Sequence, residues 1–512
     1  MYKKSFAIGC AILMLSNIIT RFMGFYYRIL MSKTIGAEAI GLYQLIMPLY
    51  ILCYSLTASG ITTTISKLTA EETAKRNDQN AAVILRISIF ITLSLSLAVS
   101  FFMYFNSGYI SSEFIKDSRS ALPIKILSLC FPFMAVCSCI KGYFLGKQSN
   151  IFPAMAQIFE QLIRMLSLMA ITGAYSPTNI SEACAAAATA VVMGEIFSFL
   201  LTVFFLFSSH SKKTSCAGPK LGKISAFKKI SHMALPLTSS RAASSFLSAI
   251  ENILIPLRLS MYPKSTNALS QYGNLTGLIM PLVHFPSSLL SAVSVSMIPA
   301  ISKQRTVKNQ ISAQNTINKS ICFTAAVSCG SSLFFYVFSN EICSIIYSLP
   351  ELGTMLKMLS ALCPIMYMHI TLNGILNSLG KHFYLFINGI ISSFVNIGFI
   401  YFFMPKVGVD AFLYGALFSS LSGVIPALII SGKYFHIKRI TAKYFTICFI
   451  CAIFSSITGK YIIGRINCVN IYGQMISMMA TYFFSLIITG VVSDITGFSV
   501  SRFCQKRPLS LK

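Results

Sequence analysis

The chain has 512 residues, of which 55% are hydrophobic and only 11% are charged. A soluble domain carries about twice that share of charged residues, so the composition excludes a soluble globular protein and indicates a polytopic membrane protein. The formal net charge of +27 would suggest nucleic-acid binding in a soluble chain. Here Lys and Arg gather between apolar segments, and no nucleic-acid partner is expected.

Hydropathy predicts about fourteen apolar segments, each near the roughly 20 residues that a membrane-spanning helix needs. The expected fold class is therefore an all-α polytopic membrane protein. In chain order the predicted spans are 5–31, 39–65, 81–106, 121–145, 151–174, 183–208, 230–257, 271–299, 313–338, 355–379, 383–404, 409–431, 441–463 and 471–493.

The basic residues are distributed unevenly between the connecting segments. Alternate connections hold most of them, as in 208–229, whereas 175–182 and 340–356 contain no Lys or Arg. The positive-inside rule then predicts a multi-pass protein of the cell membrane with both termini in the cytosol, which agrees with an even number of spans. The basic segments are expected to set this topology and to contact lipid head groups.

An internal repeat relates the two halves of the chain. Ile46-Met47-Pro48-Leu49 recurs as Ile279-Met280-Pro281-Leu282, and Gly146-Lys147 recurs as Gly380-Lys381 at nearly the same spacing. The agreement in spacing and loop position indicates a true repeat. Because the shift is six spans, an even number, the halves have the same orientation and form two parallel-repeat six-helix lobes.

The repeat and the composition together predict five regions. They are an N-lobe at 1–208 with spans 1 to 6, a basic cytosolic linker at 209–229, a C-lobe at 230–432 with spans 7 to 12, spans 13 and 14 within 433–496, and a basic cytosolic tail at 497–512.

Four arginines within or beside the spans are candidate substrate-binding residues: Arg21, Arg28, Arg241 and Arg258. A charged side chain at bilayer depth costs about 2.5–3.5 kcal/mol on insertion scales, so it usually faces a bundle interior or a cavity. Guanidinium groups suit phosphate because they donate two parallel hydrogen bonds. Arg21 and Arg241 lie in equivalent helices of the two lobes and are expected to face one central cavity. Alternatively, Arg21 forms a structural or gating pair with an acid such as Glu251. Arg28 and Arg258 lie nearer span ends, where gate and interface roles are equally open.

The acidic residues of the spans are candidates for coupling or for cavity ion pairs. Glu160 and Arg164 are four residues apart and can pair on one helix face, as a structural pair or as a substrate contact. Glu195 is a lone acid that is suited to protonation or ion coupling, or to a hydrogen-bonded structural role. Glu251 is too far along its helix from Arg241 to pair with it, so it needs a partner from another helix or from cargo.

Motifs for enzyme chemistry are absent from the sequence. There is no H-E-x-x-H and no G-x-x-x-x-G-K-[ST], so neither metal-dependent hydrolysis nor ATP hydrolysis is expected. Cys448 and Cys451 form a C-x-x-C within an apolar segment and are expected to pack as small apolar residues. No catalytic residue, metal or cofactor is predicted, and the protein is not expected to be an enzyme.

The opening of the chain resembles a known family. The relevant residues are Asn17 to Arg28, with Arg21 before Gly24-Phe25, then Ile35-Gly36-Ala37-Glu38, Gly41-Leu42-Tyr43, Pro48-Leu49-Tyr50 and Ser59-Gly60-Ile61. They resemble the stage V sporulation protein B family, a branch of the multidrug, oligosaccharidyl-lipid and polysaccharide exporter superfamily. The resemblance implies a MATE/MurJ-like fold with two six-helix lobes. It also implies translocation of an undecaprenyl-pyrophosphate-linked saccharide for spore cortex peptidoglycan.

Related lipid II flippases share an Arg before Gly-Phe in the first helix, and this position carries over to Arg21. The second Arg of that motif falls on Tyr27 here, and span 2 contains no Arg. In those relatives the last two helices form a groove for the lipid tail, which the resemblance implies for spans 13 and 14.

Three functions follow from this sequence. The first is a flippase for a lipid II-type precursor that works by alternating access, with a lipid-linked saccharide and membrane lipids as partners. The second is a cation-coupled multidrug antiporter of the same fold, which would need acids facing the cavity. The third is a non-transporting membrane scaffold for cell-wall synthesis, with cell-wall synthases as partners.

Overall fold

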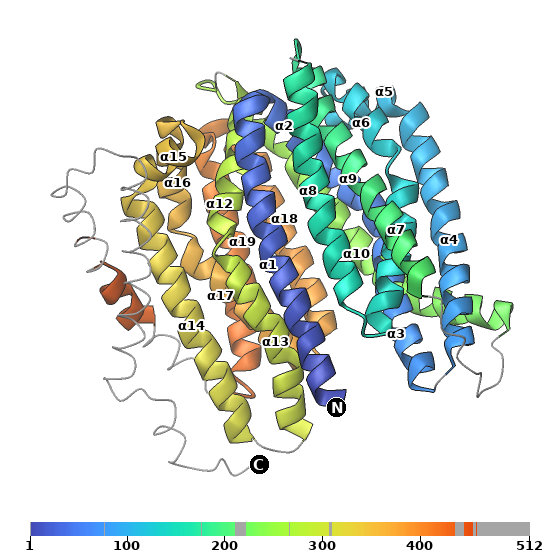
Figure 1. Cartoon of the computed structure of the whole chain (residues 1–512). Coiled ribbons are helices and arrows are strands. Elements are labelled where there is room, and N and C mark those ends of the chain that lie inside the picture. The colour runs from blue at the N-terminus through green and yellow to red at the C-terminus, as the bar shows by residue number, and fades with distance from the viewer. Residues whose placement is uncertain are drawn as a thin grey trace. The chain divides into compact units, whose positions relative to one another are not determined.

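The computed structural model describes residues 2–75, 77–175, 177–209, 222–265, 267–306, 310–435, 445–453 and 457. Helices make up nearly all of this part of the chain, and it contains no strand. The chain divides into two compact units, Met1–Gly277 and Leu278–Lys512, whose helices are labelled in Figure 1. The first unit continues past the predicted linker, and the lobe boundaries stay a prediction.

The first unit consists mainly of long helices. In chain order its elements are α1 (Tyr2–Thr34), α2 (Gly36–Tyr54), η1 (Ser55–Ser59), α3 (Gly60–Ala74), α4 (Asp78–Phe105), α5 (Ser107–Tyr109), η2 (Ile110–Ile115), η3 (Ser118–Ser120), α6 (Ala121–Ser128), α7 (Phe131–Gly146), α8 (Ile151–Ala174), α9 (Ile180–Ser209), α10 (Lys223–Leu259) and α11 (Ala268–Tyr272), followed by most of η4 (Gly273–Ile279). Of these, η1, η2 and η4 are π-helical turns.

The second unit repeats the same kinds of element. It holds α12 (Met280–His284), α13 (Ser287–Thr306), α14 (Gln310–Val337), α15 (Ser339–Tyr347), η5 (Pro350–Leu352), α16 (Gly353–Ser360), α17 (Cys363–Ser378), α18 (His382–Val407) and α19 (Asp410–Ser431). The core of this unit lies where α13, α14, α17 and α19 meet, around Ile317, Leu372 and Ala427.

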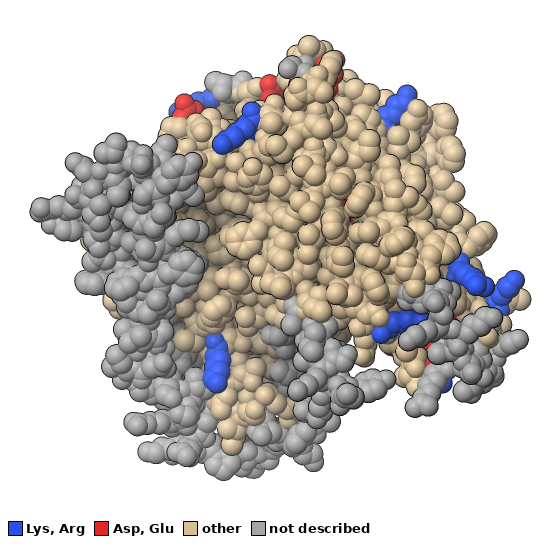
Figure 2. All heavy atoms as spheres, viewed as in Figure 1, with Lys and Arg blue, Asp and Glu red and all other residues tan. Residues whose placement is uncertain are grey.

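Among the described residues, seven helices are long and apolar enough to cross a membrane, or ten if each of three bent pairs is one span. On the face drawn in Figure 2, charged side chains lie mainly near the two ends of the helices, and the band between them is almost free of charge. This pattern is typical of a protein embedded in a bilayer. The count of fourteen stays a prediction. Spans 13 and 14 lie largely outside the described residues, although 445–453 is helical and packs on α14 through Cys448 and Cys329.

Long-range packing within the first unit brings α1 alongside α8, and α7 against α3, α4 and α9. Figure 1 shows the α1–α8 pair at the centre of the view. The helix from Gly36 to Ala74 is continuous over 39 residues and extends beyond the predicted end of span 2. Pro48 lies inside it without breaking it.

The repeat is visible in the backbone of the two units. The helix pair Ser118–Ser128 and Phe131–Gly146 bends by 47°, and the pair Pro350–Ser360 and Cys363–Ser378 bends by 54°. The same sequence offset that relates these pairs also relates further features. Residues with positive φ correspond in two places, Lys116 with Ser348 and Gln148 with Gly380. A cation–π contact also corresponds, since Lys125 lies over Tyr104 and Lys357 lies over Tyr336.

The register of the repeat differs by two residues from the sequence match. The sequence aligned Gly146 with Gly380, whereas the backbone aligns Gln148 with Gly380. Both of these residues follow a helix and have positive φ, 58° and 73°. A positive φ at a helix end is easiest for glycine, and the first half meets the same requirement with Gln148.

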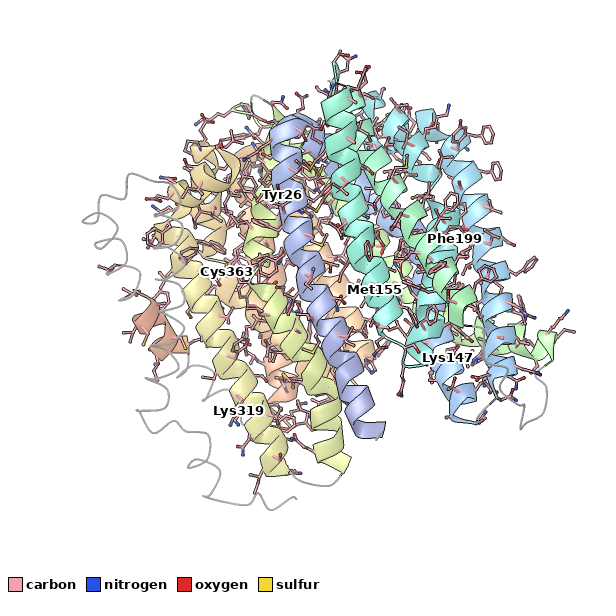
Figure 3. All side chains as sticks on the ribbon, viewed as in Figure 1. Tyr26, Lys147, Met155, Phe199, Lys319 and Cys363 are labelled. Atoms are coloured by element: carbon pink, nitrogen blue, oxygen red, sulfur yellow. The ribbon has the colours of Figure 1, made fainter. Side chains whose placement is uncertain are left out.

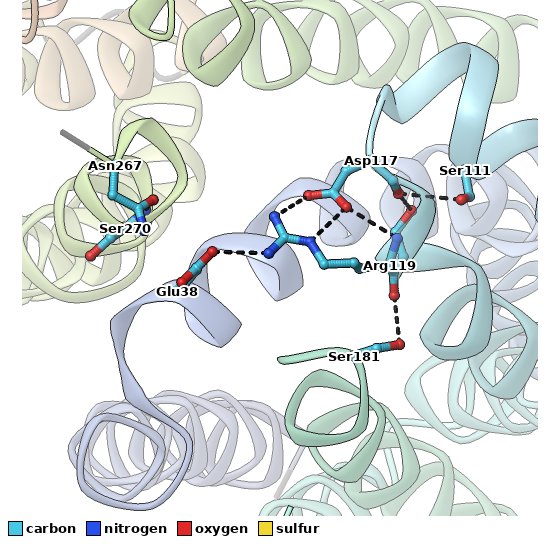
Figure 4. A network of polar contacts seen from close by, with 8 residues as sticks. Glu38, Ser111, Asp117, Arg119, Ser181, Asn267 and Ser270 are labelled. Carbon is cyan, nitrogen blue, oxygen red and sulfur yellow. Dashed lines mark hydrogen bonds and ion pairs between the residues drawn. The ribbon is translucent and has the colours of Figure 1, made fainter. Parts of the chain in front are cut away.

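Two places at the helix ends of the first unit hold paired charged groups. Figure 4 shows Arg119 donating to Asp117 at 2.7 Å and to Glu38 at 2.9 Å, while its carbonyl accepts from Ser181. This network joins the start of α2 to η3 and α9. At the far end of α7, Lys147, labelled in Figure 3, pairs with Asp78 at 3.4 Å.

Candidate functional site

A cluster of four charged side chains lies inside the first unit, on α7, α8 and α9. Lys141 on α7 approaches Glu160 on α8 at 3.1 Å. Arg164, one turn further along α8, lies 3.3 Å from Glu160 and 3.9 Å from Glu195 on α9. Their side chains are 16%, 14%, 16% and 9% exposed, in the order Lys141, Glu160, Arg164 and Glu195. These four residues are called the ionic cluster below.

The local packing explains how the cluster assembles. Glu160 and Arg164 are four residues apart and therefore share one face of α8. Gly194, just before Glu195, lies against the carbonyl of Glu160 and the Cβ of Arg164. Because Gly194 has no side chain, α9 approaches α8 closely enough for Glu195 to reach Arg164.

A tyrosine from α2 completes the environment of Glu195. The Tyr50 hydroxyl donates to Glu195 at 3.2 Å, and its ring stacks on Phe131 at 5.6 Å. Buried charges are expensive unless they are paired, and removing one partner of a buried pair typically costs 3–5 kcal/mol. The two cations therefore hold the two carboxylates in place, and Glu195 has the looser of the ion pairs.

The predicted substrate arginines are distributed over α1 and α10. Arg21 is exposed near the middle of α1, and no residue of the described ranges forms an ion pair with it, Glu251 included. Arg28 is partly buried and donates to the carbonyl of Gly277 at 2.9 Å. On α10, Arg258 lies 3.6 Å from the Met261 sulfur.

Arg241 is exposed, and two nitrogens of its guanidinium donate hydrogen bonds to the protein. It donates to the carbonyl of Ser59 and, at 3.1 Å, to the hydroxyl of Thr63. Two of its five N–H groups are used in this way, so the remaining donors are available to a ligand. The structure thus brings the predicted acids Glu160 and Glu195 together with Arg164, and it places Arg21 and Arg241 apart from that cluster with exposed guanidinium groups.

Sequence reasoning missed Lys141, Tyr50 and Thr63. Lys141 is the one charged residue in the helix Phe131–Gly146, which is a signal of the same kind as the one that singled out Arg21. Its partner, however, lies on another helix, and no spacing rule connects them. Tyr50 and Thr63 have no such signal, because their roles depend on which helices pack together.

The family assignment follows from a family model. A model described as polysaccharide biosynthesis protein matches residues 6–305. The chain belongs to this family. Stage V sporulation protein B of Bacillus subtilis (strain 168) is 28% identical to it over 502 residues, covering 95% of this chain and 96% of that protein.

Solved structures share the fold of this chain. The lipid II flippase MurJ in an inward closed conformation matches 93% of this chain and 97% of its own, with a TM-score of 0.71 and 17% identity. The match to an inward-facing multidrug resistance MATE family transporter of the MOP superfamily covers 84% of this chain and 98% of that one, with a TM-score of 0.66 and 12% identity. The predicted fold class, an all-α polytopic membrane protein of MATE/MurJ type, is confirmed. The chain groups with membrane transporters and flippases, not with enzymes.

In the described part of the second half, the positions that correspond to the ionic cluster are uncharged. The offset that relates the two bent helix pairs places Asn373, Ser392 and Asn396 where the first half has Lys141, Glu160 and Arg164. These three side chains carry no charge. Ser392 lies 3.2 Å from Ser422, and Asn373 lies 3.3 Å from His369.

Metal binding gains no support from the described residues. They contain no group of three or more His, Cys, Asp or Glu that could hold a metal ion. The carboxylates of the ionic cluster are paired with Lys141 and Arg164, which compete with any cation for the same oxygens.

Proposed function

We propose that this chain moves an undecaprenyl-pyrophosphate-linked saccharide, a lipid II-type peptidoglycan precursor, across the cell membrane by alternating access for spore cortex synthesis. The observation that carries the proposal is the match to stage V sporulation protein B along nearly the whole of both chains. The fold shared with a lipid II flippase supports it. The distribution of Lys and Arg supports a cytosolic location for both termini.

Arg21 is the proposed contact for the pyrophosphate. It lies about 20 Å along α1 from Thr34, at 1.5 Å per residue, and its guanidinium is exposed. A cation at that depth is stable beside water or an anion, not beside lipid tails. The donors of Arg241 that are not used by Ser59 and Thr63 offer a second contact, while the isoprenoid tail remains in the bilayer.

The antiporter alternative requires a carboxylate that is available to a cationic substrate. In the ionic cluster, Glu160 has two cationic partners and Glu195 has Arg164 and Tyr50. Neither is therefore free to hold a further cation without displacing a neighbour. This arrangement favours an anionic cargo over a cationic one. The scaffold alternative is tested separately, by measuring whether the protein transports any lipid-linked saccharide.

The deciding experiment measures the transfer of fluorescent lipid II between leaflets of proteoliposomes that contain the purified full-length protein. Wild-type protein should move the lipid, and Arg21→Ala should reduce the rate by about tenfold or more, because a charged hydrogen bond to phosphate is lost. Arg21→Lys should restore only part of the rate, because a point charge replaces a bidentate donor.

The same assay separates the alternatives. Arg86→Ala is the matched control, because Arg86 is an exposed arginine on α4 and should leave the rate unchanged. Normal transfer by Arg21→Ala would remove Arg21 from the site. No transfer by wild-type protein, with lipid II or with other undecaprenyl-linked glycans, would favour the scaffold.

A further inference from the structure

Two π-helical turns lie at the contacts of the arginines described above. The turn η1 lies in predicted span 2, and η4 lies in predicted span 8, which the repeat makes equivalent to span 2. A π turn replaces the usual i to i+4 hydrogen bond with an i to i+5 bond and disturbs the regular pairing of carbonyls, and such turns are frequent at functional sites. Ser59 is the last residue of η1, and Gly277 lies within η4.

The carbonyls of these two turns each accept a hydrogen bond from an arginine of the opposite repeat. Arg28, in span 1, donates to Gly277 in span 8 at 2.9 Å. Arg241, in span 7, donates to Ser59 in span 2. Spans 1 and 2 belong to the first repeat and spans 7 and 8 to the second, so the two contacts join the repeats crosswise. The offset that relates the bent helix pairs does not place Arg28 on Arg241 or Ser59 on Gly277, so these are two different contacts. All four partners belong to the first compact unit.

Close backbone packing surrounds each contact. Gly60, next to Ser59, lies against the backbone of Thr238 on α10, so that a Cβ there would collide with it. Gly273, in η4, lies in the same way against Ala37 and Gly41 of α2. The helices of the two repeats therefore touch at both places.

A tyrosine adds to the contact made by η4. The Tyr272 hydroxyl, at the end of α11, lies 3.2 Å from the Gln44 carbonyl on α2 and 2.9 Å from Asn252 on α10. At the η1 contact, the Thr63 hydroxyl accepts a hydrogen bond from Arg241 itself. Tyr272 therefore strengthens the packing of the helices around η4, and Thr63 strengthens the arginine contact at η1.

The two contacts lie at different depths in the bundle. Arg28 is about 9 Å from the end of α1, where the chain turns into α2, and Ser59 is about 35 Å along the continuous helix from that turn, at 1.5 Å per residue. We propose that Arg28 and Arg241 form two crosswise clasps between the repeats, which open one at a time as the protein exposes its cargo site to alternate sides of the membrane. The inference rests on the proposed transport function, since only a transporter needs to open both ends.

The clasps can be tested by hydrogen–deuterium exchange of the full-length protein in lipid nanodiscs. Arg28→Gln should raise the exchange of amides in 268–284 by about tenfold, because a hydrogen bond to a charged donor is lost there. It should leave 55–67 unchanged. Arg241→Gln should give the reverse pattern, and Thr63→Val should give a smaller rise in 55–67 that Thr63→Ser does not.

Arg86→Gln is the control, since Arg86 is an exposed arginine on α4 of the same unit and lies outside both clasps. The clasps would be overturned if Arg28→Gln left 268–284 unchanged, or if both arginine variants loosened both segments equally. Thr63→Val keeps the test decisive even if Arg241→Gln does not fold. A failure of the proposed cargo appears instead as absent lipid transfer by wild-type protein, with the exchange patterns intact.

Discussion

Lys141 determines whether the interior of the first unit is electrically balanced. It is the closer of the two cations that hold Glu160, and without it Arg164 alone would face two buried carboxylates. The spacing of Glu160 and Arg164 could be predicted from the sequence because both lie on one helix. The approach of Lys141 and Glu195 could not, because it depends on how α7 and α9 pack on α8.

At this scale we expect Lys141→Met to lower the free energy of unfolding by about 3 kcal/mol, because a buried carboxylate loses its partner. Thermal unfolding in detergent, followed by circular dichroism, measures the change. The double variant Lys141→Met with Glu160→Gln should recover most of the loss, since no unpaired charge then remains. A single variant as stable as the wild type would show that Glu160 is hydrated or neutral.

At the scale of helices, small residues set how closely the elements approach. Positions of the long apolar segments, including the limits of α8, followed from hydropathy. The break between α12 and α13 did not, since span 8 reads as one segment from 271 to 299. Its helices bend by 56° where Pro286 stands, whereas Pro48 leaves α2 continuous, so a proline in the sequence does not by itself locate a bend.

The close contact between η4 and α2 predicts that adding one methyl group at Gly273 lowers the stability of the protein. Gly273→Ala should destabilise the protein by about 2 kcal/mol, because the new Cβ meets the backbone of Ala37 and Gly41 and overpacking typically costs 1–3 kcal/mol. Gly24→Ala is the matched control, because nothing lies within 4 Å of a Cβ at that helical position. Equal melting temperatures for the two variants would contradict the close packing.

At the scale of the whole molecule, the two halves have kept the same backbone and diverged in charge. Short sequence identities were enough to detect the repeat, but not its register, because a left-handed residue follows the helix in both halves and only one of them is glycine. The difference between a charged interior in the first half and a neutral one in the second could not be predicted from the sequence either. Such a prediction requires knowing which positions of the two halves correspond. We therefore propose that a proton-dependent step involves the ionic cluster of the first half.

Glu195 is the carboxylate most suited to such a step. It faces Tyr50, Lys141, Glu160 and Arg164, and its ion pair is the longest in the cluster. We expect Glu195→Gln to abolish the dependence of lipid transfer on a pH gradient or membrane potential across proteoliposomes. Persistence of that dependence in the variant would leave Glu195 with a structural role.

A substitution in the second half is the control for this experiment. Ser392→Ala removes a neutral hydroxyl at the position that corresponds to Glu160. It should leave the pH and voltage dependence as in the wild type. Loss of the dependence in Ser392→Ala would place the coupling in the second half.

The ionic cluster also has an electrical consequence. When all four groups are ionised, Lys141 and Arg164 balance Glu160 and Glu195, and the cluster can move through the bilayer field without any work being done on it. Uptake of one proton would give it a net positive charge, for which each 100 mV of full membrane potential is worth about 2.3 kcal/mol. Voltage would then act on the cluster only when it is protonated, and the unprotonated cluster would cross the field at no electrical cost.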